Sequence, residues 1–263
     1  MSITVASWNV NSIRARLPLL CDWLEKVRPD VLLLQEIKCT PETFPREPLE
    51  ELGYNSLVCG EKGRNGVAIL SRFPIESLAL RLPGEEEDAE ARFAEAFTGG
   101  LRVASLYVPN GNPVEGPRFA YKLRWLARLH RHAEEVLLED ECLVFGGDYN
   151  VIPEPQDCYD PAAWEGDALY RPESRRAFRA LLNLGLYDAF RALHPDQTGA
   201  YTFWDYQGRA FQLDHGIRID HLLLSPQAVD RLEAVWIDRE PRGRPKASDH
   251  TPILARLALS RPA

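Results

Sequence analysis

The stretch "ECLVFGGDYN" (residues 141–150) combines a buried-strand pattern with polar groups at its end. Its apolar run from Leu143 to Phe145 is typical of a strand in a buried sheet. The run then passes through two glycines and reaches an acid and an amide, Asp148 and Asn150. Residues two positions apart in a strand face the same way. The stretch therefore predicts a strand that delivers two polar side chains to one place, where the glycines let a ligand come close.

Strand-like and helix-like segments alternate along the rest of the chain. Helix patterns cover residues 14–27, 118–138 and 173–183. Strand patterns cover residues 3–10, 30–36, 65–72, 93–98, 101–109, a run through Val144, 201–206, 217–225 and 251–259. Strands that follow one another directly indicate hairpins, whereas the helices at 14–27 and 118–138 indicate crossovers. This mixture predicts a layered α/β fold with mixed sheets.

Composition and charge set the broad class of the protein. The 263 residues, 27% charged and 45% hydrophobic, predict one globular domain over residues 1–263. We expect no membrane segment, because no apolar run approaches the ~20 residues of a span. The five cysteines form no CxxC pair, which favours reduced thiols in a cytoplasmic protein. The net charge of −8 is unlike the basic surface of most nucleic-acid binders, so handling phosphate would require local basic residues or a bound cation.

Polar side chains recur at the ends of the expected strands. They are Asn9, Asn11, Glu36, Asp148, Asn150, Asp220, Asp249 and His250. Each alone could be a turn, a cap or a solvated strand end, although Asp220 lies inside a strand pattern, where an unpaired carboxylate is costly. Sites in layered α/β folds are built at strand ends. Because carboxylate and amide oxygens suit Mg²⁺ or Mn²⁺, the pattern predicts a Mg²⁺-dependent phosphodiesterase.

Eight motifs bring the sequence close to a known family. In chain order they are "SWNVNSIRAR", "DVLLLQEIKC", "GVAILSR", "LYVPNG", "GGDYNVIP", "LYDAFR", "IRIDHLL" and "SDHTP". Together they resemble the exonuclease III family of class II abasic-site (AP) endonucleases, within the endonuclease–exonuclease–phosphatase superfamily. The resemblance runs from Ser7 to Pro252. It implies a DNase I-like four-layer α/β sandwich, in which two packed mixed β-sheets are flanked by helices.

The resemblance also implies roles for the metal and the attacking water. Glu36 would be the principal Mg²⁺ ligand, with Mn²⁺ able to substitute, and Asn9 or Asp249 would help directly or through water. Asp148 would align and deprotonate the water, and Asn150 would hold Asp148 or the water in place. Asp249 thus counts in both the metal-binding and the catalytic set. The identity of the general base and the number of metal ions stay open.

Three further residues would act on the scissile phosphate. By the resemblance, His250 would contact it, Asp220 would fix the His250 ring and raise its basicity, and Tyr107 would donate a hydrogen bond. The two glycines at 146 and 147 would let the DNA backbone and the metal approach.

Duplex DNA, abasic or blocked at its 3′ end, is the partner that the resemblance implies. The abasic sugar would enter an apolar pocket walled by Phe203, Trp204 and Ile219. The residues expected to contact DNA are Asn11, Arg14, Lys62, Arg64, Arg218, Arg242, Arg244 and Lys246, with Lys122 and Arg175 as further basic candidates. We expect a monomer without an obligate protein partner.

The expected activity is cleavage 5′ of abasic sites, with 3′→5′ exonuclease and 3′-end cleaning. Asn112 and Pro113 stand where some abasic-site specialists carry a basic side chain that inserts into the duplex, so a mainly exonucleolytic enzyme stays open. A lipid or inositol phosphodiesterase of the same superfamily is a less favoured alternative, because the sequence has no exposed aromatic hairpin for a membrane. A catalytically inactive RNA-binding regulator is disfavoured by the complete set of acids.

Overall fold

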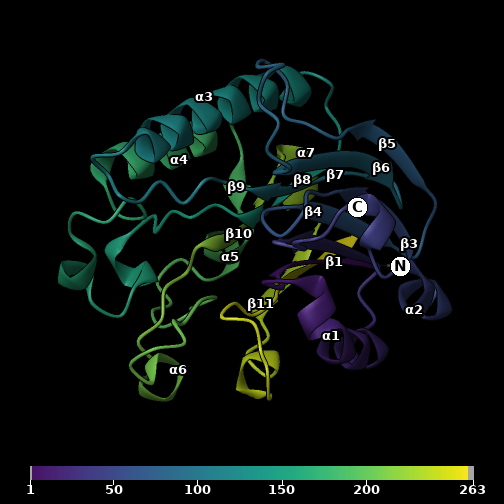
Figure 1. The fold of residues 1–263 in the computed structure, drawn as a ribbon. Helices are drawn as coiled ribbons and strands as arrows, with labels where there is room; N and C mark the ends of the chain where they lie inside the picture. The colour runs from purple at the N-terminus through teal and green to yellow at the C-terminus, as the bar shows by residue number, and fades with distance from the viewer. Residues whose placement is uncertain (1, 260–263) are drawn as a thin grey trace.

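Two six-stranded mixed sheets pack face to face in the computed structural model, which describes residues 2–259 (Figure 1). The first sheet has the order β11-β12-β1-β2-β4-β3 and the second the order β5-β6-β7-β8-β10-β9. The strands of the first sheet are β1 (Ser2–Asn9), β2 (Val31–Gln35), β3 (Asn55–Cys59), β4 (Val67–Ser71), β11 (Leu232–Ile237) and β12 (Ile253–Ala258). Those of the second are β5 (Ile75–Ala79), β6 (Phe93–Thr98), β7 (Leu101–Tyr107), β8 (Leu143–Asp148), β9 (Tyr187–Asp188) and β10 (Asp220–Leu224). Residue 1 and residues 260–263 of the expected domain lie outside this part of the chain.

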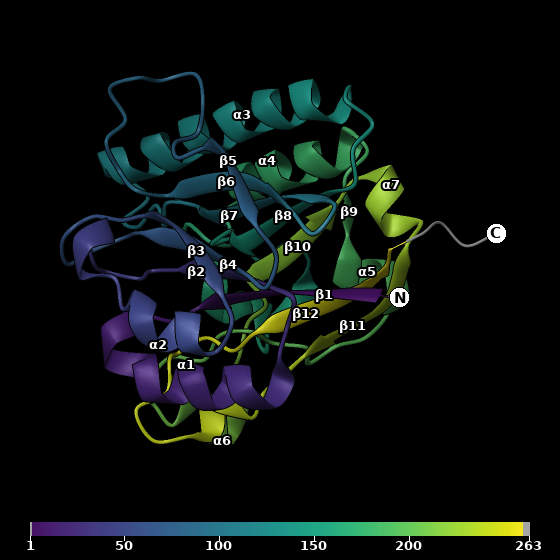
Figure 2. The same cartoon turned by 90° about the vertical axis from the view of Figure 1, so that its right-hand side faces the viewer.

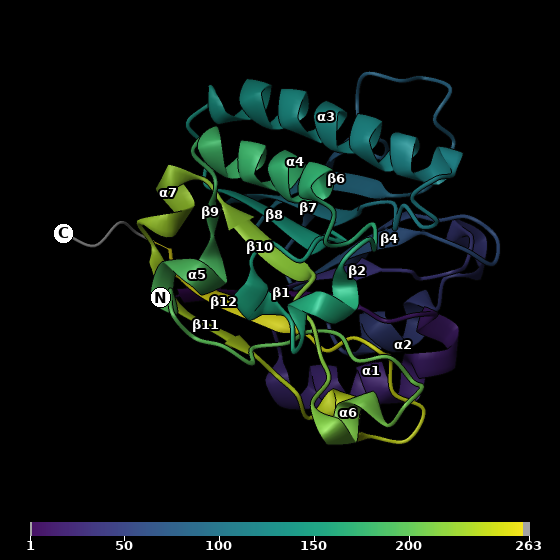
Figure 3. The same ribbon diagram turned by 90° about the vertical axis from the view of Figure 1, so that its left-hand side faces the viewer.

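Helices cover the outer face of each sheet and complete the four layers (Figure 2). Below the first sheet lie α1 (Ile13–Val27) and α2 (Arg46–Glu51), and above the second lie α3 (Pro117–Leu137) and α4 (Pro172–Asn183). Figure 3 shows α3 and α4 side by side over the second sheet. The short helices are α5 (Ala189–Leu193), α6 (Ala210–Leu213) and α7 (Pro226–Val229), and the 3₁₀ turns are η1 (Pro41–Thr43), η2 (Pro155–Asp157), η3 (Pro161–Trp164) and η4 (Pro241–Gly243). The predicted four-layer sandwich is confirmed.

The two long crossover helices lie where the sequence predicts them. Strands β1 and β2 are parallel and α1 joins them, while β7 and β8 are parallel and α3 joins them. A parallel pair requires such a crossover, because a short turn can only return the chain antiparallel. Pro117 occupies the first turn of α3, where its missing N–H costs no helical hydrogen bond. No helix within residues 2–259 is long and apolar enough to cross a membrane.

Apolar side chains between the facing sheet surfaces form the central core. Leu33 of β2 and Val144 of β8 belong to this cluster, whereas the alternate residues Leu32 and Phe145 pack outward against the helices. Both β2 and β8 are thus buried on both faces, which explains their unbroken apolar runs. The same burial brings the polar strand ends of the two sheets to one edge of the sandwich.

The glycines of β8 serve packing, and not the approach of a ligand as the sequence analysis expected. A Cβ on Gly146 would lie 2.5 Å from Leu33 Cδ1, across the interface between the sheets. A Cβ on Gly147 would lie 1.9 Å from the carbonyl oxygen of Leu106 in the neighbouring strand. Both glycines are therefore required by close contacts inside the sandwich.

The strand predicted over residues 201–206 is absent. Within the described residues of this segment, Phe203 alone makes isolated bridges, to Ile217 and to His250. The segment crosses between the ends of the two sheets and does not run along either one. The strands β3, β5, β9 and β11 lie at sheet edges and were missed. The mixed polar and apolar residues of β3 and β5 and the two-residue length of β9 give weak strand patterns.

Candidate active site

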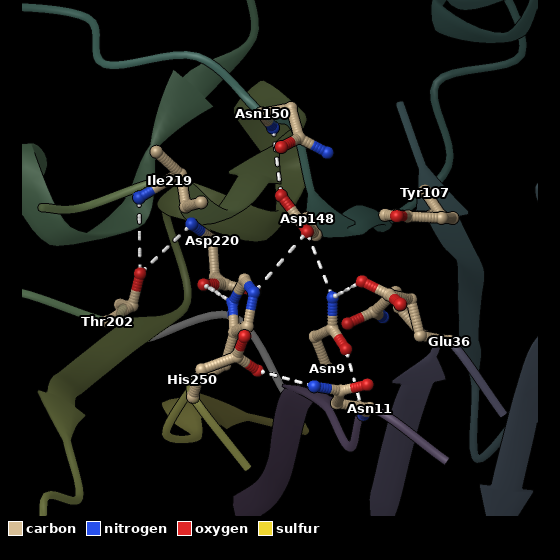
Figure 4. A network of polar contacts seen from close by, with 12 residues as sticks. Asn9, Asn11, Glu36, Tyr107, Asp148, Asn150, Thr202, Ile219, Asp220 and His250 are labelled. Carbon is tan, nitrogen blue, oxygen red and sulfur yellow. Dashed lines mark hydrogen bonds and ion pairs between the residues drawn. The ribbon is translucent and has the colours of Figure 1, made fainter. Parts of the chain in front are cut away.

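Polar side chains from both sheets converge at one edge of the sandwich (Figure 4). Asn9 ends β1, Glu36 directly follows β2, and Asp148 ends β8 opposite Asp220 of β10. Glu36 and Asn150 have φ values of 49° and 48°. This left-handed conformation is uncommon for residues other than glycine and turns the chain sharply as it leaves the sheet.

Asn9 joins the two acids across the interface between the sheets. Its Nδ2 donates to Glu36 Oε1 at 2.9 Å and to Asp148 Oδ2 at 3.0 Å. Its Oδ1 accepts the backbone N–H of Asn11 at 3.0 Å. Carboxylates only accept and a backbone N–H only donates, so these partners fix the orientation of the amide. Asn9 therefore presents N–H groups to the acids, and its help in holding a metal at Glu36 stays a prediction.

His250 is held between two buried carboxylates. Its Nδ1 lies 2.8 Å from Asp220 Oδ2, and its Nε2 lies 3.7 Å from Asp148 Oδ2. Burial lowers the pKa of His250, but the Asp220 and Asp148 carboxylates outweigh it and raise the pKa to about 10. The ring is therefore a cation at neutral pH. The contact between Asp220 and His250 that the resemblance implied is present.

Asp148 is the most heavily contacted acid of the site. Its Oδ1 accepts the backbone N–H of Asn150 at 2.9 Å, and its Oδ2 accepts Asn9 Nδ2. Burial raises the pKa of Asp148 to about 7, with Asp220 and Glu36 adding to the effect and His250 opposing it. The carboxyl is thus placed to exchange a proton near neutral pH.

The acids offer oxygen atoms that suit a hard cation. Glu36, Asp148 and His250 each place one potential ligand atom within 4.8 Å of the others. His250 is protonated, so the oxygens of Glu36 and Asp148 are the better ligands. Burial raises the pKa of Glu36, but Lys38, whose Nζ lies 2.9 Å from Oε2, and Asn9 outweigh it and lower the pKa. Two close carboxylates with oxygen donors match the preferences of Mg²⁺.

Asp249 lies beside this group and not within it. Its Oδ1 accepts Asn11 Nδ2 at 3.1 Å and the Ser248 hydroxyl at 3.3 Å. Among residues 2–259, Asp249 does not belong to the cluster of potential metal ligands. Asp249 lines the same cleft as Glu36, and its role in metal binding, directly or through water, stays a prediction.

Tyr107 closes the side of the cleft formed by β7. Burial raises the pKa of Tyr107 well above its usual value, and the Glu36 and Asp148 carboxylates add to this rise. The hydroxyl therefore stays protonated and can donate a hydrogen bond. The guanidinium of Arg92 lies 4.6 Å from the ring centroid and fixes the ring by a cation–π contact.

A cleft of about 330 Å³ opens over these groups. Two of the three predicted pocket residues, Phe203 and Ile219, line it. Trp204 does not, because its side chain is 0% exposed and its indole N–H donates to Asp214. Trp164 and Leu169 line the cleft instead. The sequence analysis missed them because their segment has no periodic pattern.

The basic residues expected to contact DNA differ in exposure. Arg14, Lys62, Arg64, Arg244 and Lys246 are exposed. Two of these are partly neutralised by ion pairs, Arg64 with Glu61 and Arg244 with Glu240. Arg242 is half-buried against aromatic rings, and Asn11 donates to Asp249 and Tyr206. Arg175 is partly buried, donates to the Pro153 carbonyl and pairs with Glu154.

Arg16 was missed and lies close to this surface. Its Nη1 donates to the Asn11 carbonyl at 2.6 Å and its Nη2 to the Tyr206 hydroxyl at 2.9 Å. These contacts hold the exposed ring of Tyr206 beside Asn11. A match to "SWNVNSIRAR" alone does not show which of its two arginines reaches the site.

Arg218 cannot contact DNA, because its side chain is 0% exposed. Its Nε donates to Asp157 at 2.8 Å and its Nη1 donates to Asp188 at 2.7 Å. Burial lowers the pKa of Arg218, but these two carboxylates outweigh it and raise the pKa. Arg218 therefore ties the segment before Asp220 to two other parts of the chain.

Replacing Arg218 by Met should destabilise the protein by about 3 kcal/mol, because breaking a buried ion pair leaves its partners charged and uncompensated. The free energy of unfolding in urea measures this effect. Arg176→Met, at an exposed position of α4, is the matched control and should change stability little. The salt dependence of DNA binding by folded Arg218→Met should equal that of the unchanged protein, and a shallower dependence would restore the DNA-contact role.

The chain is similar to known proteins in both sequence and fold. Residues 6–250 match the model of the Endonuclease/Exonuclease/phosphatase family. An exodeoxyribonuclease III of Haemophilus influenzae is 34% identical over 95% of this chain and 97% of its own length. The structure of an AP endonuclease from Archaeoglobus fulgidus superposes with a TM-score of 0.92, at 36% identity over 96% of this chain and 98% of that one. A 3′ phosphatase, NExo, from Neisseria, bound to a product DNA hairpin, superposes with a TM-score of 0.94, at 36% identity over 97% of this chain and 99% of that one.

Proposed function

The chain belongs to the endonuclease/exonuclease/phosphatase family, and on this basis we propose that it is a Mg²⁺-dependent DNA-repair nuclease. It cleaves the phosphodiester 5′ of abasic sites in duplex DNA and also removes nucleotides and blocking groups from 3′ ends. The relatives named exodeoxyribonuclease III, AP endonuclease and 3′ phosphatase support these three activities.

One observation carries the proposal: Asp148 lies at the centre of a fixed network, with direct contacts to Asn9, the Asn150 backbone and His250. Asn9 connects it to Glu36, the backbone of Asn150 fixes its second oxygen, and His250 faces it. A lone surface carboxylate would have none of these partners. The arrangement instead gives one acid a fixed orientation and a pKa near neutrality, as a general base requires.

Hydrolysis of the phosphodiester begins with an attacking water. Asp148 accepts a hydrogen bond from this water and takes its proton as the water oxygen bonds to phosphorus. Asn9 and the Asn150 backbone hold the two Asp148 oxygens in place during this transfer. The bond from phosphorus to the 3′ oxygen then breaks and this oxygen takes up a proton from solvent, which leaves a 3′-hydroxyl on one side and a 5′-phosphate on the abasic sugar.

Positive charge and hydrogen-bond donors stabilise the charge that builds on the phosphate. Protonated His250 donates to a phosphate oxygen, and Asp220 holds the ring in the required orientation. The Tyr107 hydroxyl donates a further hydrogen bond from the other side of the cleft. Mg²⁺ held by Glu36 would supply additional positive charge to the phosphate when bound. Fixed donors of this kind stabilise a transition state without reorganising during the reaction.

Substrate binding has a local basis despite the negative net charge. The exposed basic residues at positions 14, 62, 64, 244 and 246 supply phosphate contacts, and Phe203 with Ile219 supplies apolar walls for a flipped-out sugar. We place the protein in the cytoplasm as a monomer of one domain, residues 1–263, with no obligate protein partner, and Mn²⁺ should substitute for Mg²⁺.

A duplex carrying one stable abasic analogue tests the proposal. The strand is labelled at its 5′ end and incubated with protein and Mg²⁺, with EDTA as control. A single metal-dependent nick immediately 5′ of the lesion is the expected product. Absence of cleavage on abasic, intact and 3′-blocked duplexes would contradict the proposal and return attention to lipid phosphodiesters and RNA binding.

An enzyme that acts mainly on 3′ ends is the second candidate. Trp164 and Leu169 pack with Phe203 and Ile219 in one apolar cluster, and all four line the cleft beside the acids. In the same assay such an enzyme shortens the labelled strand from its 3′ end into a ladder without the nick. That result would leave the catalytic assignments unchanged and would show only that abasic-site cleavage is not the main activity.

A further inference from the structure

Lys122 lies on the buried face of α3, directly behind the cleft. Its side chain is 0% exposed, so it cannot be the phosphate contact considered from the sequence. Its Nζ donates to the carbonyl oxygens of Asn110 at 3.1 Å, Asn150 at 2.5 Å and Ala168 at 3.2 Å. An ammonium group has three N–H donors, and here each has one backbone acceptor.

A lysine without an ion pair is unusual at such depth. Among residues 2–259, Lys122 has no carboxylate within salt-bridge distance, and burial lowers its pKa to about 7. A buried charge is tolerated only when its donors are fully satisfied. The side-chain stem is also closely enclosed, since a Cβ on Gly111 would lie 2.8 Å from Lys122 Cδ. The position is therefore built around the lysine.

The three carbonyls come from three separate segments of the cleft wall. Asn110 lies between β7 and α3, Asn150 follows β8, and Ala168 lies in the long segment before α4. Asn110, Asn150 and Leu169 all line the cleft. Among the described residues, Asn112 is the only other side chain that hydrogen-bonds between the segment of Asn110 and the segment of Ala168. Its amide donates to Asp167 and accepts the Ala168 N–H.

Hydrogen bonds connect these segments to Asp148 and Asn150. The Asn150 backbone N–H binds Asp148, and Asn110 Nδ2 donates to Asn150 Oδ1 at 3.1 Å. The carbonyl and the N–H of Asn150 belong to adjacent peptide groups joined at its Cα, so a displacement of the carbonyl shifts the N–H that holds the Asp148 carboxylate. We infer that Lys122 is a positioning residue, which fixes Asp148 and Asn150 relative to the pocket wall by holding three backbone carbonyls. This inference rests on the proposed nuclease function.

Lys122→Met tests the inference because it removes the three donors and keeps a stem of similar length. We expect kcat on the abasic duplex to fall about 10- to 100-fold, since small displacements of catalytic groups have effects of this size. KM should change less than about threefold, because the exposed basic residues are untouched. Arg124→Met, on the exposed face of the same helix, is the matched control and should leave both constants unchanged.

Lys122→Arg separates positioning from a general loss of structure. Arginine keeps the charge and several donors, so it should recover part of the rate lost in Lys122→Met at a similar melting temperature. If Lys122→Met does not fold, Lys122→Arg against the unchanged protein carries the kinetic test, with a smaller fall in kcat expected. Equal kcat in all folded variants, or a fall in kcat that only parallels the melting temperature, would overturn the inference.

Hydrogen exchange gives a readout that needs no activity. In the folded variants, residues 108–112, 149–152 and 166–170 should exchange faster, while the strands of both sheets keep their protection. Unchanged exchange in these three segments would overturn the link. Because this measurement is independent of substrate, it tests Lys122 even if no DNA is cleaved, and so distinguishes failure of the inference from failure of the proposed function.

Discussion

Asp148→Asn should lower kcat on an abasic duplex by a factor of about 10² to 10⁴, because general-base catalysis contributes factors of this size. The amide has nearly the shape of the carboxyl group but cannot take a proton from water. Its remaining oxygen can still accept one of the two hydrogen bonds, from Asn9 or from the Asn150 backbone. DNA affinity should stay within about threefold, since phosphate contacts from distant basic residues dominate affinity.

The measurement is single-turnover cleavage of the labelled duplex together with a binding titration in EDTA. Asp196→Asn, the same change at an exposed position, is the control and should behave like the unchanged protein. Loss of binding in parallel with turnover would mean that Asp148 acts on the DNA and not on the water. Near-normal turnover would remove Asp148 from the role of base altogether.

Removal of divalent metal should abolish cleavage, and Glu36→Gln should make its recovery require far more Mg²⁺. Glu36 is the acid at the cleft that keeps a lowered pKa, so its carboxylate is available to a cation over a wide pH range. We expect the Mg²⁺ concentration for half-maximal activity to rise at least about 10- to 100-fold, since losses even outside the direct ligand set have this size.

A Mg²⁺ titration of the nicking rate after EDTA treatment measures this shift. Glu50→Gln, at an exposed position of α2, is the control and should leave the titration unchanged. Mn²⁺ should restore activity in the same experiment. An unchanged half-maximal concentration in Glu36→Gln would transfer metal binding to other groups, whereas cleavage in EDTA by the unchanged protein would exclude a metal requirement.

Local patterns in the sequence were sufficient for a layered α/β fold with mixed sheets and for most of the polar residues at its edge, whereas the four-layer sandwich was implied by the family resemblance. The apolar run through Val144 predicted a strand in a buried sheet, and the two long helices predicted the crossovers. Polar residues directly after such runs lie where the strand ends, at the edge of the sheet. Glu36 and Asp148 follow this rule, whereas His250 precedes β12, and the three side chains meet only because the two sheets pack against each other.

The sequence alone could not decide which basic and aromatic side chains reach the cleft. Arg218 and Lys122 are basic, as DNA-contacting residues usually are, but both side chains are buried and donate to acceptors that lie far away in the sequence. Arg218 binds Asp157, 61 residues away, and Lys122 binds the carbonyl of Ala168, 46 residues away.

Side-chain orientation at the site was likewise a property of the tertiary structure. The partners of the Asn9 amide lie on two different sheets, and the burial of Trp204 depends on Asp214 and the segment around it. Whether a polar group faces solvent, a ligand or another chain segment depends on what the fold packs around it. A desolvated charge is stable only where all its partners meet, and these partners are brought together only when the two sheets pack.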